Sequence, residues 1–360
     1  MILLITYDIR RRGGIERLSL QVRDALQREG HPCLILATRR LGPGRLGRLV
    51  GQLWFLLQLA WWLPRAELVF SMHALLLRPI RALGGLPGVR RPRQPLLCWL
   101  HGIEVWGANL APLLPDLRRC AALAASSAFT ADQVRAALGD TPPIQVIHPR
   151  ADLLPGAPPG PPPPGLRLLT VARMASQERY KGHDLILEAL HLLRQRGGLA
   201  PFPRWRVVGE GDDQPRLQAR ASHLGLADRV DWLGSLGDGA LGEEYAACSL
   251  VLMPSAFGVL ADGTAQGEGF GITYLEAALA GRPSIAADRG GQTDLILQGL
   301  TGWLLPPSAE ALADLLARLQ ADPELVRACG ERARQRALDW FSPDRQRSQL
   351  ARLVAPWLGG

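Results

Sequence analysis

The chain has 360 residues, of which 47% are hydrophobic and 21% are charged, and this composition excludes an intrinsically disordered protein. At roughly 150 residues per domain, the length indicates two domains. Lysine and arginine number 41 against 33 for aspartate and glutamate, so the formal net charge of +8 favours an anionic partner. Nucleic acid, acidic lipid headgroups and phosphorylated substrates all remain open on this ground.

The first residues and the cysteines both bear on the location of the protein. Residues 1–9 are apolar for only five positions before polar groups and three arginines follow, which is the reverse of the order in a signal peptide. The five cysteines are scattered and offer no group at metal-ligand spacing. We therefore expect a cytoplasmic protein with buried free thiols and no metal site.

Short apolar, β-prone runs alternate with helical stretches along the chain. The runs of the first half cover residues 2–9, 31–38, 66–72, 95–101, 121–127 and 144–148. The runs of the second half cover residues 166–172, 204–209, 229–234, 249–254, 282–287 and 302–307. Continuous apolar runs between helices are typical of buried parallel strands. The sequence thus predicts an α/β protein of two doubly wound, Rossmann-like domains that face a central cleft, with ligands at the carboxyl ends of the strands.

A proline-rich segment separates the two halves. Residues 155–164 contain seven prolines, which favour an extended backbone. The segment could be a ligand for a proline-binding module, but its position between two similar halves favours a stiff linker. We expect an N-terminal domain over residues 1–154, a linker over 155–165 and a second domain over 166–341.

The most hydrophobic stretch, residues 49–63, predicts a helix. It is shorter than the roughly 20 residues that span a bilayer, so we expect it to be buried or interfacial. Arg39, Arg40, Arg45 and Arg48 precede it, and cations beside an aromatic-rich apolar helix are typical of an interfacial membrane anchor. The helix, over about 46–63, is either part of the core or a contact with an anionic membrane.

Candidate site residues of the first half follow two of the apolar runs. Gly13 and Gly14 open a predicted helix, where free backbone amides attract anions, although such glycines often serve steric needs only. The turn matches neither GxGxxG nor the P-loop, which disfavours NAD and P-loop nucleotides. His101 follows the fourth run, where its side chain can point toward a ligand, and a structural role is equally open.

In the second half, two cations follow the first apolar run. Arg173 comes directly after the run, and Lys181 lies eight residues further on, before a predicted helix. Two cations at the carboxyl end of a sheet repel each other unless an anion lies between them, and a diphosphate is such an anion. Two exposed surface cations are the alternative.

The segment GEGFGITYLE carries the most information. Glu268 lies in a glycine-rich turn with Gly269 and Gly271, and Glu276 follows eight positions later on a helix that is predicted to begin after the turn. The turn offers backbone amides and a helix N-terminus to a phosphate. The two carboxylates can accept hydrogen bonds from sugar or ribose hydroxyls, whereas solvated helix carboxylates are the alternative.

Taken together, these motifs resemble the retaining GT-B glycosyltransferases of family GT4, the glycosyl transferases group 1. The Glu, seven residues, Glu pattern of GEGFGITYLE is joined in the family's order by the glycines at 13–14, HGIEVW at 101–106, Arg173 with Lys-Gly at 181–182, VVGEGDD at 207–213 and Gly-Gly at 290–291. Each motif is weak alone, but together they are specific and span nearly the whole chain.

The resemblance implies a role for each candidate residue. His101 would contact the transferred sugar, Arg173 and Lys181 would bind the diphosphate and neutralise the leaving group, Glu268 would hold sugar hydroxyls, and Glu276 would hold the donor ribose. The other positions that it implies for donor binding are Gly13, Gly14, Gly209, Leu233, Gly234, Gly269, Phe270, Gly271 and Ile272.

The resemblance also assigns the domains. Residues 1–154 would be the acceptor side, residues 166–341 would bind the nucleotide sugar, and a C-terminal helix within 342–360 would return to the N-terminal domain. Three features depart from the family pattern. The loop 256–267 is longer than usual, Asp294 stands where a glutamate is common, and HPRAD at 148–152 replaces the usual proline–asparagine–glycine turn.

The implied activity is the retaining transfer of a hexose from a nucleotide-diphosphate sugar, UDP- or GDP-linked, to a glycan or lipid-linked acceptor in cell-envelope polysaccharide biosynthesis. No metal or other cofactor is implied, and we expect no nucleic acid partner, with contact to the inner face of a membrane through residues 39–62. Two alternatives stay open: a non-catalytic basic protein that binds membrane or nucleic acid, and a nucleotide-sugar epimerase of the same fold. A phosphorylase would need a cofactor lysine, which the sequence does not identify.

Overall fold

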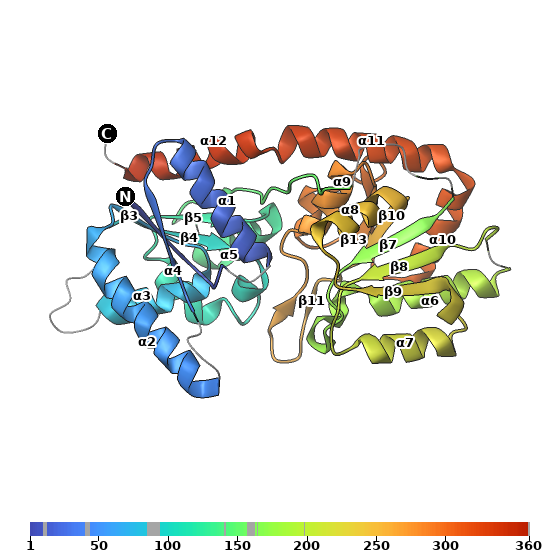
Figure 1. Cartoon of the computed structure of the whole chain (residues 1–360), viewed down its shortest axis with the longest axis horizontal. Coiled ribbons are helices and arrows are strands. Elements are labelled where there is room, and N and C mark those ends of the chain that lie inside the picture. Colours follow the sequence, from blue (N-terminus) through green and yellow to red (C-terminus); the bar gives the residue numbers. More distant parts are fainter. Residues whose placement is uncertain are drawn as a thin grey trace. The chain divides into compact units, whose positions relative to one another are not determined.

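The computed structural model describes residues 1–9, 13–39, 44–84, 94–139, 142–156, 163, 165–197 and 199–358. The chain forms two compact units (Figure 1). The first unit comprises Met1–Arg150, Asp262–Thr264 and Pro343–Gly360, and the second comprises Ala151–Ala261 and Ala265–Ser342. Of the segment expected as a linker, residues 157–162 and 164 lie outside the described residues.

The first unit is built on a six-stranded parallel sheet with the strand order β2-β1-β3-β4-β5-β6. Its strands are β1 (Ile2–Thr6), β2 (Cys33–Ala37), β3 (Leu68–Ser71), β4 (Leu96–Leu100), β5 (Ala122–Ala125) and β6 (Ile144–Val146). The central strand β1 pairs with β2 on one side and β3 on the other, with Ile2 opposite Cys33 and Leu68. All five residues of β1 are buried, because helices cover both faces of a parallel sheet.

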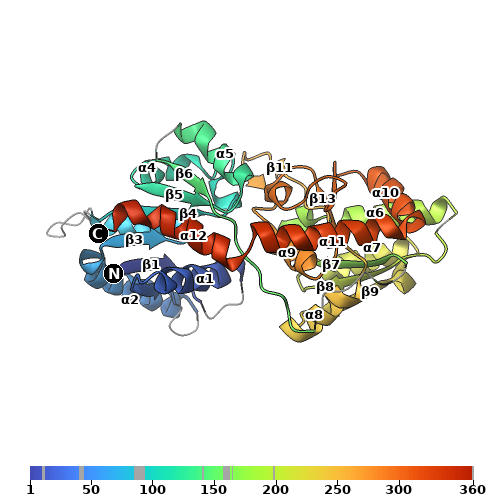
Figure 2. The same ribbon diagram turned by 90° about the horizontal axis from the view of Figure 1, so that it is seen from above.

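Helices surround this sheet, and one of them comes from the end of the chain. They are α1 (Gly14–Arg28), α2 (Gly44–Trp62), α3 (Leu77–Gly84), α4 (Leu114–Leu117), α5 (Ala128–Leu138) and α12 (Pro343–Val354). Helix α12 runs alongside α1 (Figure 2), and Leu350 and Leu353 share a core cluster with Leu18 of α1. An ion pair between Arg347 Nε and Glu29 Oε1 at 3.0 Å joins the same two segments. The C-terminal helix is therefore part of the first unit.

The second unit contains a second six-stranded parallel sheet with the order β14-β13-β10-β7-β8-β9. Its strands are β7 (Arg167–Val171), β8 (Arg204–Val208), β9 (Val230–Gly234), β10 (Leu250–Met253), β13 (Ser284–Ala287) and β14 (Gly302–Leu305). Its helices are α6 (His183–Gln195), α7 (Gln214–His223), α8 (Asp238–Ala247), α9 (Ile272–Leu279), α10 (Ala309–Ala321) and α11 (Pro323–Trp340).

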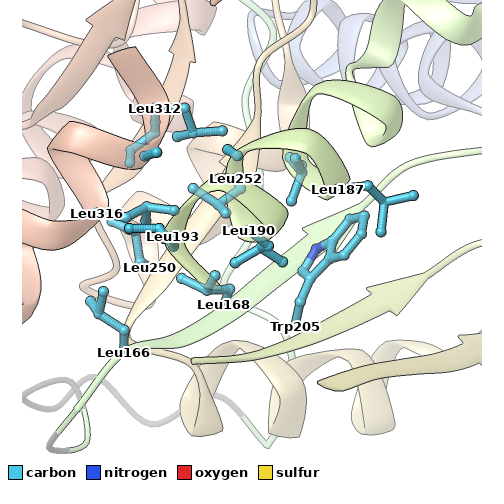
Figure 3. Close-up of a cluster of buried hydrophobic side chains, with 14 of the residues drawn as sticks. Leu166, Leu168, Leu187, Leu190, Leu193, Trp205, Leu250, Leu252, Leu312 and Leu316 are labelled. Carbon is cyan, nitrogen blue, oxygen red and sulfur yellow. The ribbon is translucent and has the colours of Figure 1, made fainter. Parts of the chain in front are cut away.

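The core of the second unit is a leucine cluster between the sheet and two helices (Figure 3). Leu168 and Leu252 come from the strands, Leu190 from α6 and Leu316 from α10. The one large aromatic ring that Figure 3 labels, Trp205, is fully buried, and its indole N–H donates to Thr170 Oγ1 at 2.9 Å, so its polar atom is satisfied.

The predicted fold class is confirmed, because each apolar run of the sequence contains one strand of the two sheets, six in each. The sequence did not predict the short antiparallel hairpin of β11 (Gly258–Val259) and β12 (Ala265–Gln266), which lies in the long loop 256–267. Strands of two residues are too short to produce a pattern of alternation. The helix expected over 46–63 is α2, and within the described ranges no helix is both long and apolar enough to cross a membrane.

In each sheet the order of the strands reverses once, and the reversal fixes where a ligand can bind. In the first unit it lies between β1 and β3, and in the second between β7 and β10. The connections from neighbouring strands leave in opposite directions at such a point, and this opens a crevice at the carboxyl ends of the strands.

Candidate functional site

Close contacts between backbones shape the crevice of the second unit. Gly209 follows β8 with φ of +133°, and a Cβ at this position would lie 2.1 Å from the carbonyl oxygen of Ala172. A Cβ on Gly211 would lie 2.0 Å from the carbonyl oxygen of Met174. The loops after β7 and β8 can therefore touch only because glycine stands at both positions.

An ion pair lies at the carboxyl edge of this sheet. Lys181 Nζ donates to Glu268 Oε2 at 2.6 Å, and each side chain is only 14% exposed. Burial opposes the charge on Lys181, but Glu268 outweighs this effect and raises the lysine pKa above its usual 10.5. The lysine is thus charged at neutral pH, and its contribution to stability is lost as the pH rises through this raised pKa.

Backbone geometry holds Lys181 in place. It ends a 3₁₀ turn (Ser176–Lys181), and Gly182 follows in the left-handed region with φ of +89°. A Cβ on Gly182 would meet Pro254, the residue after β10, at 2.7 Å. Lys181 is therefore fixed against the strand that lies across the reversal from β7.

Arg173 lies on the loop after β7 and is 74% exposed, with its Nη2 at 2.5 Å from Glu178 Oε1. The half-buried Tyr180 connects it to the ion pair, since the phenol lies in the field of Arg173, Glu178, Lys181 and Glu268. Burial is the main reason why the pKa of Tyr180 is raised, so its hydroxyl stays protonated. Two cations and two carboxylates thus act electrostatically on one tyrosine. Sequence reasoning missed Tyr180 and Glu178, although both stand between the two predicted cations.

The glycine-rich turn that carries Glu268 rests on the turn after β13. The Gly291 N–H donates to the Glu268 carbonyl oxygen at 2.7 Å, and a Cβ on Gly291 would lie 2.0 Å from the Gly269 carbonyl oxygen. Gly271 precedes Ile272, the first residue of α9, with φ of +94°. The Phe270 ring is buried against Phe341, so the side chain belongs to the core and only the backbone of this residue suits a phosphate.

Glu276 lies on α9 and is 8% exposed, so it is not a solvated helix carboxylate. The hydroxyl of Tyr245 in α8 donates to Glu276 Oε2 at 3.1 Å. Burial and the nearby carboxylate raise the pKa of Tyr245 well above 10, which keeps this donor protonated. Tyr245 orients Glu276. No local sequence pattern predicts this contact, because Tyr245 lies 31 residues before Glu276 in the chain.

The residues expected near the nucleotide base lie beside this cluster. Leu233 packs against the apolar cluster that contains Tyr245. The Gly209 N–H donates to the Gly234 carbonyl oxygen at 2.8 Å, and Glu210 Oε1 accepts from the Ser235 N–H at 3.2 Å. The structure thus groups the predicted donor-binding residues of the second unit along the carboxyl ends of β7, β8, β9 and β10.

The remaining candidates belong to the first unit. Gly13 precedes α1 in an extended conformation, and Gly14 is the first residue of the helix. His101 follows β4, and its Nε2 lies 2.7 Å from the carbonyl oxygen of Met72, so Nε2 carries the hydrogen and Nδ1 is the basic nitrogen. Both carboxylate oxygens of Glu104 accept backbone N–H groups of this turn, from His101 at 2.6 Å and from Gly102 at 2.9 Å.

Two further rings accompany His101. His73, which follows β3, stacks on it with ring centroids 5.6 Å apart, and Tyr7, which follows β1, places its hydroxyl 3.5 Å from His73 Nδ1. Burial lowers the pKa of His73 to about 4, so the ring is neutral at pH 7. Neither His73 nor Tyr7 was selected as a site candidate from the sequence. The structure places both at the strand reversal of the first unit, beside the predicted histidine.

Comparison with known proteins identifies a family for the second half of the chain. A family model described as "Glycosyl transferases group 1" matches residues 163–336, which include the ion pair and the glycine-rich turn. The chain thus contains a glycosyl transferases group 1 domain over these residues. It is 27% identical over 347 residues to a GDP-mannose-dependent alpha-(1-6)-phosphatidylinositol monomannoside mannosyltransferase of Mycolicibacterium smegmatis, and the match covers 90% of this chain and 83% of the relative.

Other similar proteins match in part or in fold alone. The chain is 36% identical over 141 residues to an exopolysaccharide phosphotransferase of Streptomyces coelicolor, but the match covers 38% of this chain and spans only 14% of the relative. The crystal structure of HepE from Anabaena in complex with UDP and glucose has a TM-score of 0.76 at 20% identity, and covers 99% of this chain and 100% of that chain. This likeness confirms the GT-B fold of two Rossmann-like domains.

The ion pair leads to a prediction about stability. Lys181→Met leaves the largely buried Glu268 carboxylate without its cation and should lower the free energy of unfolding by about 3 kcal/mol. Adding Glu268→Gln should recover most of this loss, because the uncompensated charge is then gone. Urea unfolding, monitored by hydrogen exchange of the backbone amides in β7, β10 and α9, gives the free energy of unfolding of the second unit alone.

A surface pair of similar geometry is the matched control. Arg196 and Asp314 lie 2.6 Å apart and are 46% and 70% exposed, so Arg196→Met should change the free energy by less than about 1 kcal/mol. Equal effects of Lys181→Met and Arg196→Met would contradict the energetic importance of the buried pair.

Proposed function

We propose that the protein is a retaining glycosyltransferase that moves a hexose from a nucleotide-diphosphate sugar to a glycan or lipid-linked acceptor. The observation that carries the proposal is the Lys181–Glu268 ion pair at the strand reversal of the second unit, beside a glycine-rich helix start. A cation and amides there suit a diphosphate, and a carboxylate in the same place suits sugar hydroxyls. The match of residues 163–336 to the glycosyl transferases group 1 supports this choice.

The proposed reaction breaks the bond between the anomeric carbon and the diphosphate oxygen while negative charge grows on the departing diphosphate. Lys181, Arg173 and the amides at the start of α9 would oppose that charge where it develops. The acceptor hydroxyl forms the new bond from the side that the diphosphate leaves, and its proton goes to the diphosphate. Retention follows, and neither a protein base nor a metal is required, so a chelator should leave the rate unchanged.

Binding of a donor would rearrange the charges around Tyr180. Glu178 pairs with Arg173, and Glu268 pairs with Lys181, so each cation has a carboxylate partner. A diphosphate can take over both cations, which would free Glu268 for the sugar. We therefore propose that the Glu178 carboxylate pairs with Arg173 until the donor diphosphate binds and replaces it.

The donor is proposed to be UDP- or GDP-linked. HepE was crystallised with UDP and glucose, which supports a UDP-linked donor. The Mycolicibacterium relative is named as GDP-mannose-dependent, which supports a GDP-linked donor. A thermal-shift screen of UDP, GDP, ADP and dTDP tests it, since a ligand at 100 times its Kd stabilises by about 2.7 kcal/mol. Release of the nucleoside diphosphate from the preferred donor, abolished by Glu268→Ala, tests catalysis. Return of an altered nucleotide sugar instead would indicate an epimerase.

The name of the Streptomyces relative supports a place in polysaccharide biosynthesis. We propose that the enzyme works in the cytoplasm on cell-envelope polysaccharide, at the inner face of a membrane. Cell fractionation after osmotic lysis tests the location, and loss of the enzyme from the membrane fraction in high salt is expected for a peripheral protein.

The next prediction concerns donor binding. Glu276→Ala should weaken donor affinity at least tenfold and change the rate at saturation much less, because the ribose is remote from the bond that breaks. Tyr245→Phe removes only the hydroxyl that orients Glu276 and should weaken affinity about fivefold. Tyr274 is equally buried, with its hydroxyl on the Met253 carbonyl oxygen, so Tyr274→Phe is the matched control. The affinities are measured by calorimetric titration of the donor. Wild-type affinity in Glu276→Ala and Tyr245→Phe, as in the control, would refute the ribose role.

A further prediction concerns the leaving group. Arg173→Ala and Lys181→Ala should each lower turnover about 100-fold or more, as removal of a charge stabiliser does. Arg173→Lys should retain more activity than Arg173→Ala if charge is what matters, and equal loss in both would indicate bidentate geometry instead. Arg327 also pairs with a glutamate at 2.5 Å, on the surface of α11, so Arg327→Ala should leave turnover unchanged.

A further inference from the structure

A cavity of about 780 Å³ lies in the first unit between α2 and the carboxyl ends of β1 and β2. Four charged residues line it, namely Asp8, Glu16, Arg39 and Arg48, and Phe55 and Leu56 of α2 form an apolar wall. The size is that of a small-molecule site, which is roughly 300–1,000 Å³ in proteins. The cavity lies beside the strand reversal of this unit, where a ligand is expected.

The lining of the cavity defines the kind of ligand that fits. Arginines bind phosphate with their planar fork of donors, and Arg39 and Arg48 supply two of them. The carboxylates of Asp8 and Glu16 accept hydrogen bonds from hydroxyl groups, and the wall of Phe55 and Leu56 suits hydrocarbon. A phosphorylated, hydroxylated head that is attached to an apolar anchor combines all three.

The outer face of α2 is apolar. Large hydrophobic side chains at positions 46, 49, 50, 53, 54, 57 and 61 are between 45% and 73% exposed. Their spacing of three and four residues places them along one side of the helix. The buried residues of α2 are Gly47, Gly51, Phe55 and Leu59, which lie four residues apart on the other side. One face of α2 therefore packs on the unit while the other presents leucine and tryptophan to the surroundings.

Cations flank this apolar face and no acidic residue interrupts it. Residues 44–62 contain Arg45 and Arg48, both exposed, and neither aspartate nor glutamate. Beyond the helix, the Arg65 guanidinium lies 3.8 Å from the centroid of the Trp61 ring. Arginine beside tryptophan and leucine is the composition of helices that lie in the headgroup region of anionic bilayers.

We infer that α2 docks the first unit on an anionic bilayer and that the cavity on its inner side receives the phosphorylated, hydroxylated head of a lipid acceptor. The inference rests on the proposed function and narrows its acceptor to a membrane lipid. One helix connects the two events, since Arg48 is exposed and also lines the cavity, while Leu49, next in sequence, is exposed on the apolar face. The lipid anchor stays in the bilayer and only the head enters the cavity.

Co-sedimentation with vesicles tests the docking step. The full chain should pellet with vesicles that contain phosphatidylglycerol and stay in the supernatant with pure phosphatidylcholine. Because the Debye length falls from about 10 Å at 0.1 M salt to about 3 Å at 1 M, high salt should weaken binding. Arg45→Gln should lower affinity about fivefold, the equivalent of ~1 kcal/mol for one arginine near such a surface.

The apolar face is tested with matched triple variants. Replacement of Leu49, Leu53 and Leu57 by glutamine should lower vesicle affinity at least tenfold. Leu297, Leu300 and Leu338 are also exposed, but in the second unit, and their replacement by glutamine should leave vesicle binding unchanged. Absence of vesicle binding at low salt would overturn the proposal, as would a dimer in gel filtration that the first triple variant dissociates, because the face would then bind a second copy.

The cavity is tested with dihexanoyl phosphatidylglycerol below its micelle concentration, a soluble probe that carries the phosphate, the hydroxyls and short chains. It should bind at least fivefold more tightly than inorganic phosphate or dihexanoyl phosphatidylcholine. Arg39→Gln should remove most of this difference and leave vesicle pelleting almost unchanged. Arg23→Gln on α1, outside the cavity lining, should leave both the difference and the pelleting unchanged. Equal binding of inorganic phosphate and the lipid would overturn the assignment to a lipid head.

The failure of this inference can be told apart from failure of the proposed function. Thermal shifts with UDP and GDP report on the second unit, and they need neither vesicles nor an acceptor. A donor shift without vesicle or lipid binding would leave a glycosyltransferase with a soluble acceptor. Vesicle binding without any nucleotide shift would instead refute the transferase and keep the docking surface.

Discussion

The Lys181–Glu268 ion pair joins side chains 87 residues apart in sequence, and the arrangement of the second unit's site depends on it. Two charges at low exposure are stable only as a pair, so the turn before α6 and the turn before α9 must meet at one place. Glycines make that meeting possible, since Gly182 lies against Pro254 and Gly291 against the backbone of Gly269. The two charged residues and the glycines at 182 and 291 therefore meet the same requirement, which is that distant turns of the second unit lie in contact.

Much of the fold could be predicted because its signal is local. A continuous apolar run such as that of β1 or β10 indicates a strand buried on both faces, whatever the distant sequence contains. The residues that follow such runs could be chosen as site candidates by the same logic, as for Arg173 and His101. The partners of these residues could not, since Tyr245 contacts Glu276 from another helix and His73 stacks on His101 from another strand.

Helix α2 shows a different kind of limit. Its sequence is apolar almost throughout, so periodicity alone leaves the buried side undefined, and burial in the core and contact with a membrane were equally good readings. The tertiary structure separates the two sides, because only Gly47, Gly51, Phe55 and Leu59 are buried. A small residue at two of these four positions lets the helix approach the unit closely and leaves its bulky side chains on the outside.

The position of α12 has a consequence for the synthesis of the protein. Leu350, Leu353 and Val354 complete the core beneath α1, although the whole second unit precedes them in the chain. A chain that emerges from the ribosome can finish the second unit once residue 342 is free, whereas the first unit must wait for its last helix. The part made first is thus the part completed last, and until then the apolar surface that α12 covers stays open to chaperones.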